Sequence, residues 1–163
     1  MGYLVTVVIG AVLAIGSGDS LEIEIRNFEQ SAGRVSFRVL VRNLGSTPLY
    51  LEEFTRGKRD LYAVNIERAT GPHTWEVIGP HRDTQPADVF PLLGGGSIEV
   101  RIDLLDPYPK IYETPARYIA LVGKFRATVR YFHSQAESEK IRKERTYRWP
   151  EASSSAVTIS QRK

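Results

Sequence analysis

The stretch Ser97–Leu105, which reads SIEVRIDLL, decides the fold class of this 163-residue chain. Aliphatic side chains occupy every second position, and charged ones stand between them: Ile98, Val100, Ile102 and Leu104 against Glu99, Arg101 and Asp103. Because successive side chains of a β-strand point to opposite faces, this pattern gives one apolar face and one wet face. It predicts a strand that covers a hydrophobic core.

The same period of two recurs on both sides of this stretch. It is found at residues 21–26, 35–42, 124–131 and 156–160, with shorter strands expected at 49–51, 61–66 and 74–78. Turn residues separate these runs, and three prolines make residues 79–91 an expected irregular segment, as is 106–122. Seven to nine short strands at this spacing are typical of an all-β, antiparallel, immunoglobulin-like β-sandwich, here expected over residues 19–163.

No window of a dozen residues has convincing helical periodicity. Residues 136–145 contain good helix formers but a single large apolar residue, Ile141, so they have no face to bury. We expect this segment to be a solvated hairpin tip or a frayed turn.

The N-terminal segment 1–18 differs from the rest because Tyr3–Ile15 is almost entirely apolar. At roughly 13 residues this run is shorter than the ~20 that span a bilayer, and its length suits an export signal. No Lys or Arg precedes it, so two alternatives stay open: a retained hydrophobic strand or anchor that packs on a partner, and a strand of the domain's own core. The export interpretation predicts a secreted, periplasmic or cell-surface protein.

Composition excludes several kinds of chemistry. The chain has no cysteine, which rules out disulfides, thiolate zinc sites, iron–sulfur ligation and a cysteine nucleophile. It carries 22 Lys+Arg against 19 Asp+Glu, and a net charge of +3 is too weak to indicate nucleic acid.

Candidate catalytic or metal-binding groups do not assemble in the sequence. His73, His81 and His133 lack ligand spacing and an accompanying carboxylate cluster. The glycines at 94–96 precede a strand rather than the helix that a phosphate site requires, so they indicate a hairpin turn. We therefore expect no catalytic residue, no metal, no cofactor and no enzymatic activity.

Aromatic and basic residues in expected loops are the better functional lead, since rings at loop tips anchor partners. The candidate partner-binding residues are His81, Arg82, Tyr108, Tyr112, Tyr147, Arg148 and Trp149. Trp75 and Tyr118 are further aromatic candidates, with core filling as the alternative for Trp75. The basic tract 140–149 also holds glutamates, which disfavours nucleic acid. The expected partner is a protein, self-assembly included, and membrane contact is expected only through residues 3–15 if they are retained.

Five segments occur in an order that resembles the immunoglobulin-like domain found ahead of the catalytic domain in some secreted deuterolysin-type metallopeptidases. They are residues 43–51 (NLGSTPLYL), 79–82, 92–97 (LLGGGS), 102–108 and 123–125. The similarity covers about residues 20–160 and extends to stand-alone bacterial sandwich domains. The peptidase domain with its H-E-x-x-H helix is absent from this chain, and Phe125 stands where such domains usually place a tyrosine.

These observations predict a non-catalytic, extracytoplasmic module that acts by protein–protein interaction or assembly. The resemblance alone implies an alternative, a peptidase-associated inhibitor or pro-domain-like regulator.

Overall fold

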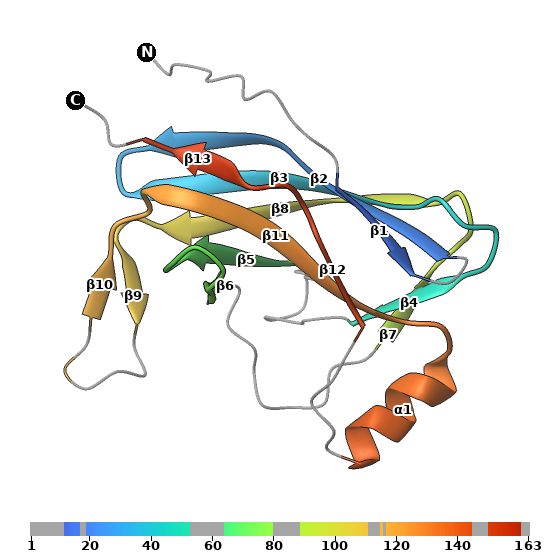
Figure 1. The fold of residues 1–163 in the computed structure, drawn as a ribbon. Coiled ribbons are helices and arrows are strands. Elements are labelled where there is room, and N and C mark those ends of the chain that lie inside the picture. Colours follow the sequence, from blue (N-terminus) through green and yellow to red (C-terminus); the bar gives the residue numbers. More distant parts are fainter. Residues whose placement is uncertain are drawn as a thin grey trace.

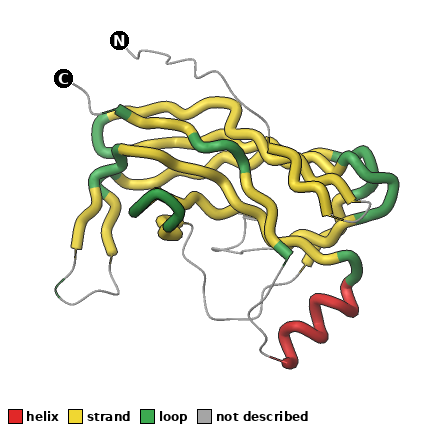
Figure 2. Tube along the Cα trace, in the orientation of Figure 1, coloured by secondary structure: helices red, strands yellow, loops and turns green. Residues whose placement is uncertain are grey.

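The structure is a computed structural model, and it describes residues 12–16, 19–52, 64–79, 89–110, 115, 117–144 and 150–160. Within these residues lie thirteen strands and one short helix (Figures 1 and 2). All the strand pairs are antiparallel. The prediction of an all-β, antiparallel chain is therefore confirmed.

One sheet has four strands in the order β1-β2-β3-β8. Their bounds are β1 Val12–Gly16, β2 Asp19–Ser31, β3 Arg34–Asn43 and β8 Ser97–Leu105. β3 and β8 pair without interruption from Arg34↔Leu105 to Arg42↔Ser97, so the predicted strand at 97–105 lies at one edge of this sheet.

The second sheet has seven strands and curls as a half-barrel. Its central path is β6-β5-β11-β4-β7, and β12 and β13 pair with the long β11 as well. The bounds are β4 Leu49–Glu52, β5 Val64–Ala69, β6 Trp75–Gly79, β7 Val89–Leu92, β11 Gly123–Phe132, β12 Glu151–Ser153 and β13 Val157–Ile159. A separate hairpin joins β9 Tyr108–Lys110 to β10 Arg117–Ile119.

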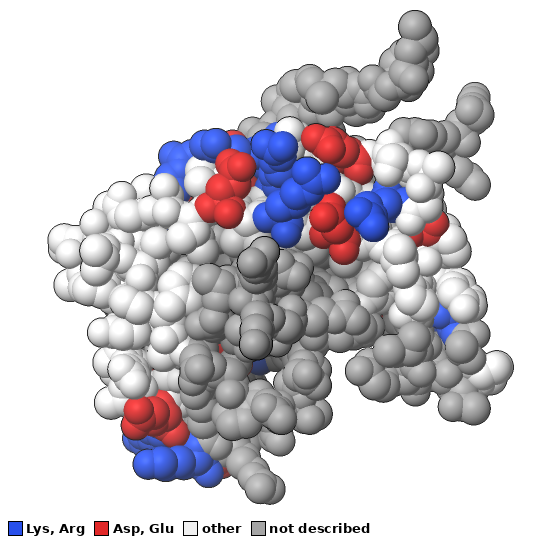
Figure 3. All heavy atoms as spheres, turned by 180° about the vertical axis from the view of Figure 1, so that it is seen from behind, with Lys and Arg blue, Asp and Glu red and all other residues white. Residues whose placement is uncertain are grey.

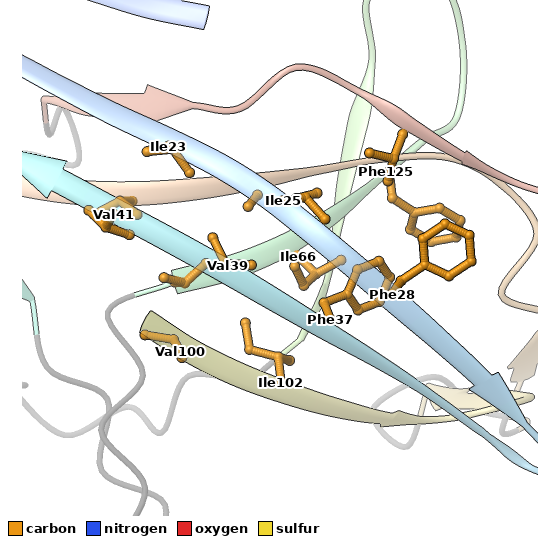
Figure 4. Packing of buried hydrophobic residues seen from close by; sticks show 14 of the residues in the cluster. Ile23, Ile25, Phe28, Phe37, Val39, Val41, Ile66, Val100, Ile102 and Phe125 are labelled. Atoms are coloured by element: carbon orange, nitrogen blue, oxygen red, sulfur yellow. The ribbon is translucent and has the colours of Figure 1, made fainter. Parts of the chain in front are cut away.

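The hydrophobic core lies between the two sheets (Figure 4). Phe37 of β3 and Phe125 of β11 are fully buried, with ring centroids 5.9 Å apart, so the two sheets meet through these rings. The aliphatic residues that the alternation assigned to the inner face of β8 are buried here, except for the half-buried Ile98. Burying a large aliphatic or aromatic side chain stabilises a fold by about 1.5–3 kcal/mol, which makes this core the main source of stability.

A β-bulge in β2 changes which residues face the core. Ile25 pairs with Val39, the next paired residue is Asn27 opposite Arg38, and Arg26 is left unpaired. The extra residue shifts the alternation by one, so that Phe28 is buried opposite Phe37 although it lies an odd number of positions after Ile25.

The sequence predicted a hairpin tip or a frayed turn at residues 136–145, and this prediction is wrong. Residues 135–144 form the helix α1, Gln135–Glu144. The Ser134 hydroxyl accepts a hydrogen bond from the Glu137 amide at 3.1 Å, and the Glu137 carboxylate accepts one from the His133 amide at 2.7 Å. These bonds satisfy amide groups at the helix start that would otherwise lack partners. Local capping thus forms a helix that has almost no apolar face.

The irregular segments also contain strands. Residues 89–91 belong to β7, and the β9–β10 hairpin lies within residues 106–122, so the described parts of both segments contain strands. The polar stretch before residue 156 contains β12. Residues 12–16 form β1 on the edge of β2, while residues 1–11 lie outside the described part of the chain. No helix among the described residues is long and apolar enough to cross a membrane.

Candidate functional site

Two loops at one end of the molecule are joined through Asn43, the last residue of β3. Its side-chain amide, fully buried, donates hydrogen bonds to the carbonyl oxygens of Thr47 at 2.7 Å and Leu92 at 3.0 Å. Its side-chain oxygen accepts one from the Gly45 amide at 3.0 Å. One side chain therefore closes the β3–β4 loop on itself and ties it to the end of β7.

Backbone contacts reinforce this connection. The Gly95 amide donates to the carbonyl oxygens of Asn43 at 2.9 Å and Gly45 at 3.1 Å. At Gly94 an added Cβ would lie only 2.3 Å from the carbonyl oxygen of Ser46, so the two backbones approach too closely for any side chain. The β3–β4 and β7–β8 loops thus form one rigid unit, which we call the loop pair (residues 43–48 and 92–97).

The loop pair exposes two leucines. Leu44 is 50% exposed and Leu93 is 64% exposed, one on each loop. No Asp, Glu, Lys or Arg occurs in residues 43–51 or 89–98. The end of the molecule that carries these loops, at the right in Figure 1, corresponds to the upper left of the view in Figure 3, which is white, with the charged cluster of the lower left below it. The surface around these two leucines is therefore uncharged.

The outer face of the four-stranded sheet is, by contrast, densely charged (Figure 3). Arg38 lies directly opposite Arg101, an unfavourable like-charge pair. Acidic neighbours offset this repulsion, because the Glu99 carboxylate lies 4.0 Å from Arg38 and the Asp103 carboxylate lies 3.2 Å from Arg101. Most of these charges are paired among themselves, so the described residues of this face form no basic patch for an anionic partner.

Asp103 on the same face is held by hydrogen bonds. Burial on its own raises the pKa of its carboxyl group, but hydrogen bonds from Ser36 and Arg101 and the nearby positive charges outweigh it and lower the pKa below the usual value of 3.8. Asp103 is therefore an ionised structural residue at neutral pH.

A second polar cluster lies along β5 and β11. The Arg126 guanidinium is 4.4 Å above the Trp75 ring, and two of its nitrogens each lie 2.7 Å from one carboxylate oxygen of Glu67. Such stacking combines a cation–π contact with a charge-assisted hydrogen bond. Trp75 is half-buried beneath this arginine and does not belong to the core cluster.

The cluster continues at Arg130, which lies 3.6 Å from Glu52 and 3.8 Å from Glu151. Burial lowers the pKa of Arg130 despite these partners. Burial, with the negative charge of Glu67, raises the pKa of Glu151 above its usual value of 4.5 even though Arg130 and Arg126 oppose the shift. The charged forms of both groups are thus poorly solvated here.

Two uncharged side chains lie between these ion pairs. Thr128 of β11 stands directly opposite Asn65 of β5, and each is 1% exposed. The Thr128 Oγ1 and Asn65 Oδ1 atoms have no hydrogen-bond partner among the described residues. An unpaired buried polar atom costs about 1–3 kcal/mol, so this part of the sheet is less stable than its packing alone would make it.

Of the seven predicted partner-binding residues, only Tyr108 lies in the described part of the chain. It begins β9, and its side chain is 7% exposed within the core cluster, with its ring near Gly79. It is therefore buried rather than at a loop tip. His81, Arg82, Tyr112, Tyr147, Arg148 and Trp149 lie outside the described residues, and their role stays a prediction. Tyr118, by contrast, is exposed on β10.

The two exposed leucines were not singled out from the sequence. The available signal was an apolar residue inside each turn sequence, Leu44 within NLGSTP and Leu93 within LLGGGS. Turn residues favour exposure, yet Leu92 in the same sequence LLGGGS is buried in the core, so this signal does not by itself identify Leu93. No group of three or more His, Asp or Glu residues in the described part of the chain could hold a metal ion.

Comparison with known proteins gives no family. No protein-family model matches the chain, and no curated protein matches it. Two structures of β-glucosidase from Kluyveromyces marxianus, one selenomethionine-labelled and one in complex with glucose, align with 88% and 86% of this chain at 12% identity. Their TM-scores are 0.36 and 0.37, and the chain covers 14% of each. Scores this low carry no argument about family or activity.

Proposed function

We propose that this chain is a non-catalytic, immunoglobulin-like module that works outside the cytoplasm by contact with another protein. The two antiparallel sheets around one core support the fold, together with the resemblance carried by residues 43–51 and 92–97. The apolar run Tyr3–Ile15 supports the location by its length and composition, and its last four residues belong to β1 in the structure. The observation that carries the function is the pair of exposed leucines on loops that are rigidly joined through Asn43.

Rigidity favours binding at this surface. The hydrogen bonds of Asn43 and the close approach of Gly94 to Ser46 fix both loops before a partner arrives. A preformed contact surface loses little conformational entropy on association. The leucines therefore contribute most of their burial energy to the complex.

The size of the apolar contribution favours a protein over a lipid surface. Complete burial of a leucine gives about 1.5–3 kcal/mol, so two leucines that are already half-buried give about 2–3 kcal/mol together. A myristoyl chain buries far more apolar surface and still binds membranes only marginally. A protein partner adds shape complementarity and hydrogen bonds to the loop backbone, which a bilayer does not.

The test places a photo-cross-linking amino acid at position 93 in the full chain, expressed in the cells that make it. We expect a covalent protein adduct on irradiation. The matched control carries the same amino acid at position 105, since Leu105 is 55% exposed at the opposite end of β8. Absence of a protein adduct at position 93, or equal adducts at both positions, contradicts the proposal.

A further inference from the structure

We infer that removal of the apolar N-terminal segment opens the outer edge of β2, and that an extended aliphatic strand of another protein pairs with this edge. The inference rests on the proposed function, because it requires that the chain is exported. β2 lies between β3 and β1 in the four-stranded sheet (Figure 1), and β1 is the one described strand on the outer edge of β2. Loss of β1 therefore exposes main-chain groups of β2.

The expected cleavage site coincides with the end of β1. Ala14 and Gly16 are small residues two positions apart at the end of the apolar run, which is the pattern that marks signal-peptide cleavage and places the cut after Gly16. Gly16 is also the last residue of β1, and β2 begins at Asp19. A cut at this point removes the whole of β1 and leaves β2 entire.

The composition of β1 is that of an export segment and not of a strand adapted to this sheet. β8, at the opposite edge, alternates aliphatic and charged residues because one face of the sheet is wet. β1 reads VLAIG and does not alternate in this way. Its Leu13 stands opposite Glu22, whose carboxylate lies 3.2 Å from the Arg42 guanidinium on the charged face. An aliphatic residue thus occupies a position that is charged on the neighbouring strand.

The part of β2 that β1 covers is also the part without protection against strand pairing. Natural edge strands carry bulges, prolines or unpaired charges that oppose the addition of a further strand. The bulge of β2 lies at Arg26, beyond β1, and residues 19–25 contain neither proline nor lysine. Glu22 and Glu24 form ion pairs with Arg42 of β3 at 3.2 and 3.1 Å, so their charge is neutralised. Removal of β1 leaves a regular edge that can pair with a new strand.

β1 shows what kind of strand fits this edge. Ala14 stands opposite the buried Leu21. Val12 stands opposite Ile23, which is buried too. A replacement strand would supply main-chain hydrogen bonds along the edge and small aliphatic residues at these two positions, and polar residues suit the position opposite Glu22. The partner is therefore an extended segment in which small aliphatic and polar residues alternate.

Two measurements on the full chain, expressed in the cells that make it, test the inference. N-terminal sequencing of the exported protein is expected to give Ser17 as the first residue. A photo-cross-linking amino acid at position 22 is expected to give an adduct with another protein on irradiation. The matched control is position 29, because Glu29 is also a glutamate of β2 on the charged face but lies beyond the bulge. No adduct is expected there, and circular dichroism verifies that both labelled proteins are folded.

Several outcomes overturn the inference: an exported protein that retains residues 12–16, no adduct at position 22, an adduct with a second copy of this chain, or equal adducts at positions 22 and 29. If the position-93 adduct forms while position 22 gives none, the inference fails and the proposed function stands. A chain that stays in the cytoplasm with its first sixteen residues contradicts instead the location given in the proposed function.

Discussion

The side-chain amide of Asn43 donates a hydrogen bond to the carbonyl oxygen of Leu92 over 3.0 Å, across a sequence separation of 49 residues. This bond makes the position of one loop depend on the other. The two leucines of the loop pair are thereby held as one surface rather than as two independent tips.

Asn43→Ala is expected to lower the free energy of unfolding by about 3 kcal/mol, because it removes three hydrogen bonds from a fully buried side chain. Denaturant titration measures the loss. The matched control is Asn65→Ala, which removes an equally buried amide whose oxygen has no partner among the described residues. It is expected to cost about 1 kcal/mol or less, and equal losses would show that the Asn43 bonds contribute little.

Thr128→Val is expected to stabilise the protein by about 1 kcal/mol. The substitution keeps the branched shape on a strand and removes a buried hydroxyl that has no partner among the described residues. Denaturant titration again provides the measurement. Thr158→Val on β13 changes an exposed hydroxyl and serves as control, with an expected effect below about 0.5 kcal/mol. Destabilisation by Thr128→Val would mean that the hydroxyl is satisfied.

Gly94→Ala is expected to destabilise the protein by about 2–3 kcal/mol, because the new methyl group would overlap the Ser46 carbonyl. Gly95→Ala is the control, since it has a φ of 72° but no heavy atom near the added Cβ. Only the backbone penalty of about 1 kcal/mol applies there. Thermal unfolding of both variants distinguishes a steric clash from backbone strain, and a smaller loss for Gly94→Ala contradicts the close approach.

Glu151→Gln tests the raised pKa of Glu151. A carboxyl group with a raised pKa stabilises the fold fully below its unfolded value near 4.5, and this contribution disappears as the pH rises through the folded pKa. The variant is thus expected to be more stable than the wild type at pH 7 and equal to it near pH 3. The gain is a fraction of a kcal/mol because the side chain is 35% exposed. Unfolding free energies of both proteins measured between pH 3 and pH 7 provide the test, and a difference that does not change with pH contradicts the raised pKa.

Asp103→Asn is expected to show the opposite pH dependence. The lowered pKa of Asp103 means that its ionised form stabilises the fold above pH 3.8 and that this contribution is lost as the pH falls through the folded pKa. The variant should therefore be less stable than the wild type at pH 7 and approach it in acid. The test is the unfolding free energy of variant and wild type, measured from pH 7 into acid. If the stability difference between the two proteins does not change with pH, the Asp103 carboxylate is not the cause of that difference.

Sequence alone predicted the strands whose alternation is uninterrupted. The inner face of β8 was recovered because burial on one side of a sheet imposes a period of two. The alternation failed in β2, where the unpaired Arg26 shifts Phe28 into the core. β7 was missed because Pro91 opposes a central strand, whereas the strand lies at an edge.

The helix and the loop pair were missed for different physical reasons. α1 depends on the cap formed by Ser134 and Glu137, a local signal, whereas hydrophobic periodicity reports only buried faces. The turn at Asn43 was predicted from its residue types. The hydrogen bond from Asn43 to Leu92 and the exposure of Leu93 depend on how distant segments pack together. Neither can be predicted from one stretch of sequence.

The bulge in β2 also determines where this strand can vary in length. Removal of Arg26 would leave Ile25, Asn27 and Phe28 in simple alternation, with every apolar side chain still facing inward. Removal of Asn27 would have the same effect, with Arg26 in its place opposite Arg38, whereas removal of a residue farther from the bulge would turn part of the strand inside out. Homologous chains that are one residue shorter here should therefore have lost Arg26 or Asn27, and an engineered shortening of the strand is confined to these two positions.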